Sequence, residues 1–230
     1  MKTVITMVVL VLALASIGCS SKLSEAQSAY DDGVVAFNGG LYVDAISKFD
    51  KSINIDPDFS HSYNDRGSVY HELGQYERAI EDFNKAIQLD SDYAEAYGNR
   101  GLSNRNLGQW QRAIEDYDIA MELGLRDAKI FVSRGYAYYS MQQIERAIED
   151  YDEGIKIAPN MPLAYNNRGI AYGDLGRYER GMQDLEMAIQ LDPNFAMAHY
   201  NRSIGYSILG RNSESKADAA KACSLAPVYC

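Results

Sequence analysis

Side chains that commonly carry acid–base or metal chemistry are sparse in this chain and poorly placed for it. His61, His71 and His199 are the only histidines among 230 residues. His61 and His71 are widely separated along one predicted helix, and no third ligand stands near them, whereas a metal site needs several ligands. We therefore predict no metal site and interpret the histidines as surface or groove residues.

Adjacent carboxylates recur along the chain as Glu81-Asp82, Glu115-Asp116 and Glu149-Asp150. Neighbouring positions of a helix face different directions, so the two members of a pair cannot act together on one substrate. Their return at a fixed interval indicates a structural role instead. The sequence also lacks a nucleophile elbow, a phosphate-binding glycine loop and a zinc-ligand motif. We predict that the protein is not an enzyme, has no catalytic residue and needs no cofactor.

A constant interval organises the sequence. Five arginines recur every 34 residues: Arg66, Arg100, Arg134, Arg168 and Arg202. Each interval contains two apolar helical patterns that are separated by a turn. We number each unit from 1, which puts these arginines at position 7. A fixed period of this size is the signature of a repeat protein, in which each unit contacts mainly its neighbours. The pattern gives six units: 26–59, 60–93, 94–127, 128–161, 162–195 and 196–229.

Charges and small residues are correlated between the two helices of a unit. Position 23 holds aspartate in five units, and the first unit exchanges the two charges between Asp32 and Lys48. We expect a salt bridge between the two helices of each unit or between adjoining units. Mid-helix glycines such as Gly67 fall opposite small residues such as Ala79, which predicts close helix packing. In the fourth unit Gln142 replaces the turn glycine, so it must either adopt the turn or extend the helix.

These units resemble the tetratricopeptide repeat (TPR). The resemblance rests on the helix pair, on the small-residue and aromatic positions and on the terminal proline, as in Asp56-Pro57, and it covers Ala26 to Tyr229. It implies an all-α fold, a right-handed superhelical solenoid of six TPR helix pairs. It further implies a concave groove that is lined by the first helix of each repeat and binds a protein or peptide segment.

The resemblance places positions 2, 5, 6, 9, 12 and 13 of each unit in that groove. The second and third units then contribute a polar stretch that includes Asn64, His71, Asn99 and Arg105. The later units contribute a more aromatic and apolar stretch that includes Val132, Tyr136, Tyr139, Asn166, Asn167, Ile170, Tyr200 and Ile204. Asparagine amides can bind the backbone of an extended peptide, and tyrosines provide rigid contact surface. The alternative is that these tyrosines only fill the interior of the superhelix.

The N-terminus carries an apolar run from Val4 to Ile17. This run is too short for an ordinary transmembrane helix and suits a signal peptide. Ser16-Ile17-Gly18-Cys19 resembles a bacterial lipobox, which implies a signal peptide over 1–18 and a lipidated Cys19 that begins a tether over 19–25. Ser20 resembles the residue found in lipoproteins of the outer membrane, where the chain would face the periplasm. Alternatively, cleavage after Ala15 would release a soluble periplasmic or secreted protein.

Two further cysteines, Cys223 and Cys230, lie near the C-terminus. In an oxidising periplasm they could form a disulfide bond that holds the tail, and the alternative is a buried thiol beside a frayed terminus. The formal net charge of the chain is −10. This charge argues against nucleic acid as a partner, because phosphate binding needs a basic face.

Together these features predict a non-enzymatic adaptor that is attached to a membrane only through its lipid and binds an extended segment of a partner protein. The architecture resembles pilotin lipoproteins of type IV pilus secretins and outer-membrane scaffold lipoproteins that bind murein hydrolases. The alternative is a self-assembling structural lipoprotein, a homodimer formed through the terminal repeats.

Overall fold

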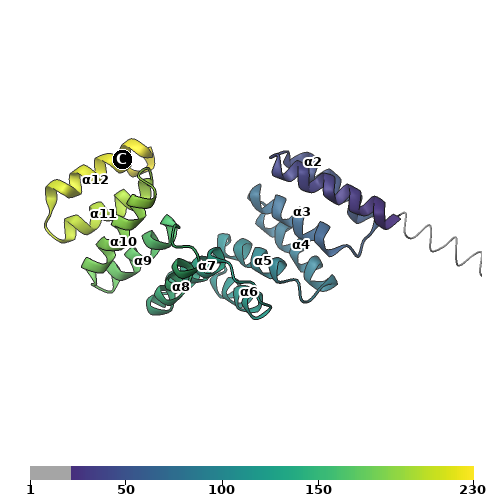
Figure 1. The fold of residues 1–230 in the computed structure, drawn as a ribbon, viewed down its shortest axis with the longest axis horizontal. Helices are drawn as coiled ribbons and strands as arrows, with labels where there is room; N and C mark the ends of the chain where they lie inside the picture. Colours follow the sequence, from purple (N-terminus) through teal and green to yellow (C-terminus); the bar gives the residue numbers. More distant parts are fainter. Residues whose placement is uncertain (1–21) are drawn as a thin grey trace, which may run out of the picture. The chain divides into compact units, whose positions relative to one another are not determined.

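The computed structural model describes residues 22–230, and the predicted lipobox and Cys19 lie outside this range. Within the described part of the chain all regular structure is helical (Figure 1), and none of these helices is long and apolar enough to cross a membrane. A first helix over 22–38 precedes the following elements: α2 (Tyr42–Ile55), α3 (Ser60–Glu72), α4 (Tyr76–Leu89), α5 (Ala94–Asn106), α6 (Trp110–Glu122), α7 (Ala128–Ser140), α8 (Ile144–Ile157), α9 (Pro162–Asp174), α10 (Tyr178–Leu191), α11 (Ala196–Ile208), α12 (Asn212–Leu225) and η1 (Pro227–Tyr229).

The chain forms two compact units. The first contains the residues up to Leu107 together with Glu122–Gly124, and the second contains Gly108–Met121 and Leu125–Cys230. Within each unit the helices pack in consecutive pairs, α3 with α4, α7 with α8, α9 with α10 and α11 with α12. Each of these pairs consists of the two helices of one predicted repeat. The predicted all-α repeat fold is therefore confirmed.

Close packing of α3 on α4 depends on one glycine. Ala79 and Phe83 of α4 are completely buried. A Cβ atom added at Gly67 in α3 would lie 2.8 Å from the Phe83 ring and 3.2 Å from the carbonyl oxygen of Ala79. The expected approach of Gly67 to Ala79 is thus present, and the aromatic ring at position 24 completes it. Gly135 repeats the arrangement in α7, where an added Cβ would lie 2.8 Å from the ring of Tyr151 in α8.

Gln142 adopts the turn rather than extending the helix. Its φ angle is 62°, close to the 70° of Gly176 at the same repeat position. The backbone N–H groups of Gln142 and Gln143 donate to the carbonyl oxygens of Tyr139 and Tyr138, each at 2.9 Å. The turn therefore keeps its backbone hydrogen bonds although Gln142 has a side chain in a left-handed conformation that favours glycine.

The predicted salt bridges are present within repeats two, four and five. Arg66 donates to both carboxylate oxygens of Asp82, at 2.8 and 2.6 Å, and also to Asp50 of the preceding repeat. The same double pairing occurs at Arg134 with Asp150 and Asp118, and at Arg168 with Asp184 and Asp152. The second carboxylate, at position 25 of the preceding repeat, is not predicted from the sequence. It turns a bond within one repeat into a link between two repeats.

The ends of the repeat array vary this pairing. Asp32 and Lys48 of the first repeat meet at 3.4 Å on an exposed surface, as their exchanged charges predict. At the other end Arg202 donates to Asp218, and the ring of His199 lies 3.2 Å from the same carboxylate. Burial would raise the pKa of Asp218, but the hydrogen bonds from Arg202 and His199 lower it below its usual value. Removing one partner of such a buried pair costs about 3–5 kcal/mol.

Candidate functional site

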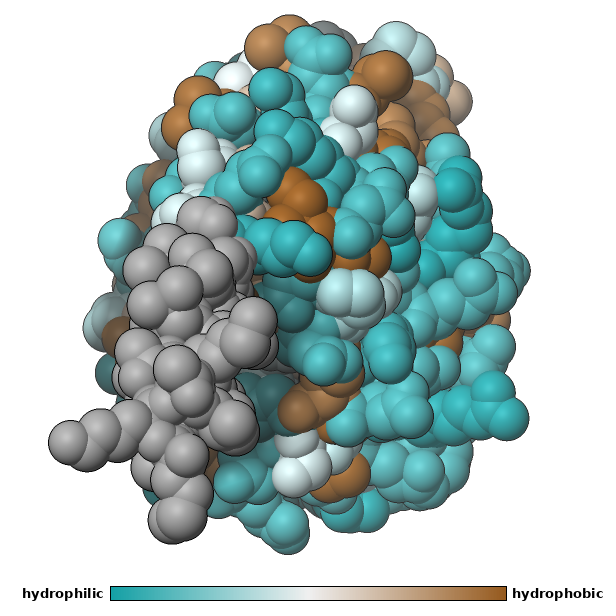
Figure 2. Space-filling model, turned by 90° about the vertical axis from the view of Figure 1, so that its right-hand side faces the viewer, coloured by the Kyte–Doolittle hydropathy of each residue, from teal (hydrophilic) through white to brown (hydrophobic). Residues whose placement is uncertain are grey.

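Exposed apolar side chains gather on the first helices of the last two repeats. Tyr200, Ile204 and Ile208 are 38%, 44% and 56% exposed on α11. Their spacing of four residues places them on one side of the helix. Met197 on α11 and Leu163 on α9 are also exposed. Figure 2 shows another face of the molecule, on which no such row of apolar residues stands out. Its coloured part is mainly hydrophilic, and its hydrophobic residues lie in small groups. We call Tyr200, Ile204 and Ile208 the α11 stripe.

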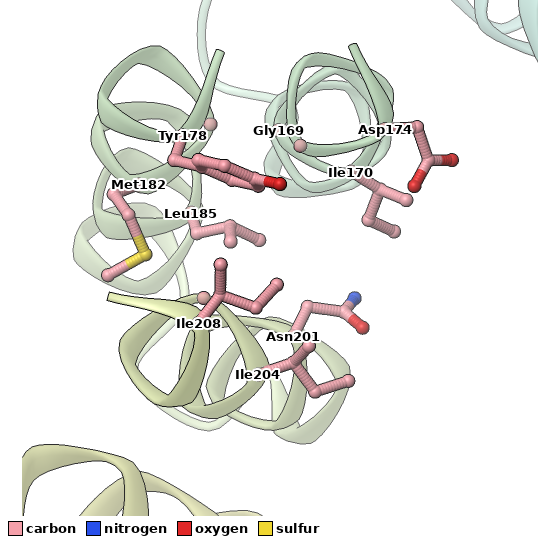
Figure 3. Close-up of a pocket in the computed structure, with 12 residues that line it drawn as sticks. Gly169, Ile170, Asp174, Tyr178, Met182, Leu185, Asn201, Ile204 and Ile208 are labelled. Atoms are coloured by element: carbon pink, nitrogen blue, oxygen red, sulfur yellow. The ribbon is translucent and has the colours of Figure 1, made fainter. Parts of the chain in front are cut away.

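A cavity of about 420 Å³ lies beside the α11 stripe, between α9, α10 and α11 (Figure 3). Ile208 points from α11 toward Leu185 on the α10 wall, and Ile204 and Ile170 line the cavity from α11 and α9. The remaining lining residues are Gly169, Gly173, Asp174, Tyr178, Gly181, Met182, Asn201 and Gly205. Of the 12 residues that line this cavity, only Asp174 carries a charge. We call this space the five–six cavity.

Two of the predicted groove asparagines stabilise the scaffold instead. Asn64 is 4% exposed, donates to Asp65 at 2.9 Å and accepts a hydrogen bond from Asn99 at 3.1 Å. Asn166 is fully buried and accepts from Asn201 at 2.9 Å. Each bond joins position 5 of one first helix to position 6 of the next. The side chains of Asn64 and Asn166 therefore cannot reach a partner, which corrects their predicted role.

The other predicted polar residues of repeats two and three also bond within the chain, either to a neighbouring first helix or along their own helix. The Nδ1 atom of His71 lies 2.8 Å from the hydroxyl of Ser103, and burial lowers the pKa of His71. Arg105 donates to Asn106 at 3.1 Å. Asn99 is half-buried by its bond to Asn64. This stretch is polar as predicted, but much of its hydrogen-bonding capacity is used within the unit.

The predicted tyrosines differ in how far they are available. Tyr136 is 41% exposed and packs edge-on against Trp110 at 5.8 Å. Tyr139 donates its hydroxyl to Asp174 at 2.6 Å, and burial together with this carboxylate raises the pKa of Tyr139. Tyr200 stacks on Tyr229 at 5.0 Å while leaving part of its ring exposed. Tyr136 and Tyr200 thus do more than fill an interior.

The apolar residues predicted for the groove lie in different environments, and one cavity residue was not among those predicted. Ile170 and Ile204 line the five–six cavity, whereas Asn167 is not among its lining residues and accepts a hydrogen bond from Asn166 at 3.1 Å. Val132 is 4% exposed, so its predicted place in the groove is wrong; its side chain packs near Gly154. Ile208 was not singled out. Its position, 13 in the sixth repeat, holds a polar residue in every other unit, and that departure is the signal that could have identified it.

The tail that carries Tyr229 is joined to α12. A disulfide bond connects Cys223 and Cys230, whose Cα atoms are 4.7 Å apart. It keeps η1 beside α11, where Tyr229 meets Tyr200. Formation of this bond in the cell stays a prediction, because it requires an oxidising compartment.

Comparison with known families identifies the class of protein. A model described as TPR repeat matches residues 67–108 and 135–176, and two models described as tetratricopeptide repeat match residues 162–195 and 48–81. These matches cover more than half of the chain, which therefore belongs to the TPR family. TPR proteins bind protein or peptide partners and are generally non-enzymatic. The chain is a protein–protein interaction scaffold of this kind.

Solved structures agree with this assignment. YrrB, described as a TPR protein with an unusual peptide-binding site, is 21% identical, with a TM-score of 0.64 over 78% of this chain and 92% of that one. MamA is 29% identical, with a TM-score of 0.64 over 71% of this chain and 96% of that one. The pilF protein of Pseudomonas aeruginosa is 16% identical, with a TM-score of 0.78 over 90% of this chain and 94% of that one. A search with the sequence found no match among curated proteins.

Proposed function

We propose that this chain is a lipid-anchored adaptor of the bacterial envelope that binds an extended segment of a partner protein on the first helices of its last repeats. The observation that carries the proposal is the α11 stripe, three large side chains exposed in one line. Exposed apolar side chains that form a continuous surface mark interaction sites, whereas isolated ones are ordinary. Tyrosine and isoleucine provide contact area with little loss of side-chain entropy.

The form of the stripe suits a polypeptide in an extended conformation. Met197 to Ile208 span roughly 16 Å of helix at 1.5 Å per residue, a length that several residues of an extended chain can cover. Asn167 and Asn201 lie on the same side of α9 and α11 and provide amide groups for backbone hydrogen bonds. A partner in secretin, pilus or envelope assembly fits the proposed compartment.

In-cell photo-crosslinking tests the adaptor. A photoreactive phenylalanine derivative at position 204 is expected to yield one major adduct, mapped by mass spectrometry to a contiguous segment of a partner. Gln183 of α10 is exposed and lies outside the five–six cavity, so it is the matched control position. Equal adducts from positions 204 and 183, or adducts only with the chain itself, would contradict an adaptor that uses α11.

The anchor has its own test. Several acyl chains on Cys19 would hold the protein at the outer membrane, since each buried methylene contributes roughly 0.8 kcal/mol. We expect Cys19→Ala to abolish incorporation of labelled fatty acid and to move the protein from the membrane fraction to the periplasm. Label retained by the variant would remove the lipobox proposal. A wild-type chain that begins after Ala15 and carries no lipid would support the soluble alternative.

Self-assembly is the second candidate function, and the first repeat supports it. Val35 and Val43 are 73% and 80% exposed, although Val69, at the repeat position of Val35, is completely buried. The difference arises because a preceding repeat covers Val69, and no described repeat precedes Val35. Light scattering over a range of concentrations decides between the two candidates: a dimer that Val35→Lys dissociates supports self-assembly, and a monomer throughout excludes it.

A further inference from the structure

We propose that the five–six cavity is an anchor pocket for one large aliphatic or aromatic side chain of the partner segment, next to a lysine or arginine of that segment. The inference rests on the proposed function, because it assigns a subsite and a partner chemistry to the same first-helix surface. It goes further by naming the place where most of the binding energy is expected. Such energy is concentrated in a few well-packed pockets rather than spread over an interface.

The size and chemistry of the cavity fit an apolar side chain. Its volume of about 420 Å³ lies in the range of ligand pockets. Leu185, Ile170 and Met182 provide apolar walls, and Ile204 and Ile208 of the α11 stripe line the remaining side. An inserted ring or branched aliphatic group would lose its contact with water on several sides at once. Each Å² of apolar surface removed from water contributes roughly 25 cal/mol to binding.

The cavity results from residue choices that the other repeats do not make. At position 12 repeat five has Gly173, where repeat four has Tyr139. A Cβ atom added at Gly173 would meet no other atom within 4 Å, so the backbone there leaves room for a side chain. At position 24 Leu185 stands where repeat four has the fully buried Tyr151. Repeat four shows that the same scaffold accepts large side chains at both positions.

The charge of the rim favours a cationic neighbour of the anchor. Asp174 is exposed, and one of its oxygens accepts from Tyr139 while it lines the cavity. No lysine or arginine is among the lining residues, and the chain has a formal charge of −10. A lysine or arginine beside the anchor side chain could therefore approach Asp174 without an opposing cation. Such a rim charge contributes mainly to specificity and association rate.

A polypeptide fits this site better than a free small molecule. The apolar surface continues beyond the cavity to Tyr200 and Met197, which are exposed along the same helix. A small molecule would use the cavity alone and leave that continuation without a role. An extended segment can place one side chain in the cavity and lay its neighbours along the α11 stripe.

Gly173→Tyr provides a direct test because it fills the cavity with the residue that repeat four has at this position. Its matched control is Ser207→Tyr, the same repeat position one unit later, exposed and outside the cavity lining. A random linear peptide library is first selected on the mature full-length protein in detergent. Binding of the selected peptides to the wild type and to both variants is then measured by calorimetry.

We expect selected peptides to share a large apolar residue with a nearby lysine or arginine. Gly173→Tyr should lower the affinity of these peptides roughly tenfold or more, because the anchor side chain can no longer be buried. Ser207→Tyr should change their affinity little. Asp174→Asn should lower the affinity of the peptides less than Gly173→Tyr does, and peptides selected on it should show no preference for a lysine or arginine. Circular dichroism on Gly173→Tyr confirms that the repeat array is still folded.

Three outcomes would overturn the inference, and they separate it from the proposed function. Peptides that bind Gly173→Tyr as well as the wild type, yet lose affinity with Tyr200→Ala, would leave the adaptor standing and remove the anchor. If no peptide is selected, and crosslinking from position 204 also yields no partner, both proposals fail together. If indole raises the unfolding temperature of the wild type but not of Gly173→Tyr, and no peptide binds, the cavity is a small-molecule site.

Discussion

The junction between repeats two and three and the junction between repeats five and six occupy the same place in the repeat and differ fourfold in free volume. The first, between α3, α4 and α5, leaves about 100 Å³, and the second leaves about 420 Å³. His71 and Phe83 stand at positions 12 and 24 of the filled junction, where the open junction has Gly173 and Leu185. Side-chain volume at two positions therefore decides whether a junction is core or pocket.

The two junctions also differ in how their polar groups are satisfied. At the filled junction His71 lies in hydrogen-bonding distance of Ser103, and Asn99 bonds to Asn64, so neighbouring first helices are tied together. At the open junction Asn201 makes the equivalent bond to Asn166, but Gly205 and Ile208 stand where the filled junction has the polar residues Ser103 and Asn106. An unfilled apolar cavity lowers stability. Keeping one between repeats five and six is typical of a site in which function opposes stability.

The largest expected effect is from truncating the residue at position 24 in each junction. Phe83→Ala should lower the free energy of unfolding by about 3–5 kcal/mol, because Phe83 is completely buried against Gly67. Leu185→Ala should lower it by about 2 kcal/mol, the lower end for such changes, because one side of Leu185 already borders empty space. Urea unfolding followed by circular dichroism measures both.

Repeat arrays can unfold in steps, so a probe of individual helices is needed beside the circular dichroism of the whole chain. Amide hydrogen exchange in α4 and in α10 shows which repeat each substitution opens. Equal losses for Phe83→Ala and Leu185→Ala would mean that the two junctions are packed alike, and the volume difference would then have no energetic meaning.

The sequence predicted the frame of these junctions better than their contents. The Arg66–Asp82 bond could be inferred because the exchanged pair Asp32 and Lys48 reports a contact between two positions. The second carboxylate, Asp50, could not, since its position holds Asn84 in the next repeat and the correlation is broken. Period and charge correlation are properties of the chain alone, and they sufficed for the all-α repeat fold.

Burial of single residues was harder to infer, because it depends on a neighbour one repeat away. Asn64 has the residue type of a ligand contact, and only the position of Asn99 on the adjacent helix shows that it is buried. Leu185 departs from the aromatic residues of repeats one to four at position 24, whereas position 12 holds a different residue in every repeat, so Gly173 does not stand out in the sequence. That they open one cavity together with Gly205 of the next repeat follows only from packing, since these residues come from three helices.

Glycine-to-alanine substitution should have opposite effects at Gly67, position 8 of repeat two, and at Gly173, position 12 of repeat five, and this is the next smaller prediction. Gly67→Ala should lower the free energy of unfolding by about 1–3 kcal/mol, because the new Cβ would press on Phe83 and on the carbonyl of Ala79. Gly173→Ala should raise it by about 0.5–1 kcal/mol, because its Cβ meets nothing and alanine restricts the unfolded chain. Thermal and urea unfolding of the two variants give the signs directly, and a loss of stability in both would show that Gly173 does not border open space.

The smallest expected effect is a pH dependence that belongs to the filled junction. Burial lowers the pKa of His71, so the unfolded chain, with an ordinary histidine pKa of about 6.5, binds the proton more readily than the folded one. The contribution of His71 to stability is therefore complete above about pH 6.5 and declines as the pH falls through that value toward the lower pKa of the folded state.

Urea unfolding at several pH values between about 5 and 8, the range in which histidines titrate, measures this decline. We expect His71→Gln, which keeps a polar side chain beside Ser103, to reduce the loss of stability on acidification, because glutamine binds no proton in this range. His61→Gln is the matched control, because it makes the same change at an exposed histidine. Since Gly173 replaces the histidine at the open junction, amide exchange in α9 and α10 should lack this contribution. If the unfolding free energy of His71→Gln depends on pH as steeply as that of the wild type, other groups cause the acid sensitivity. The pH dependence would then not come from the histidine that fills this junction.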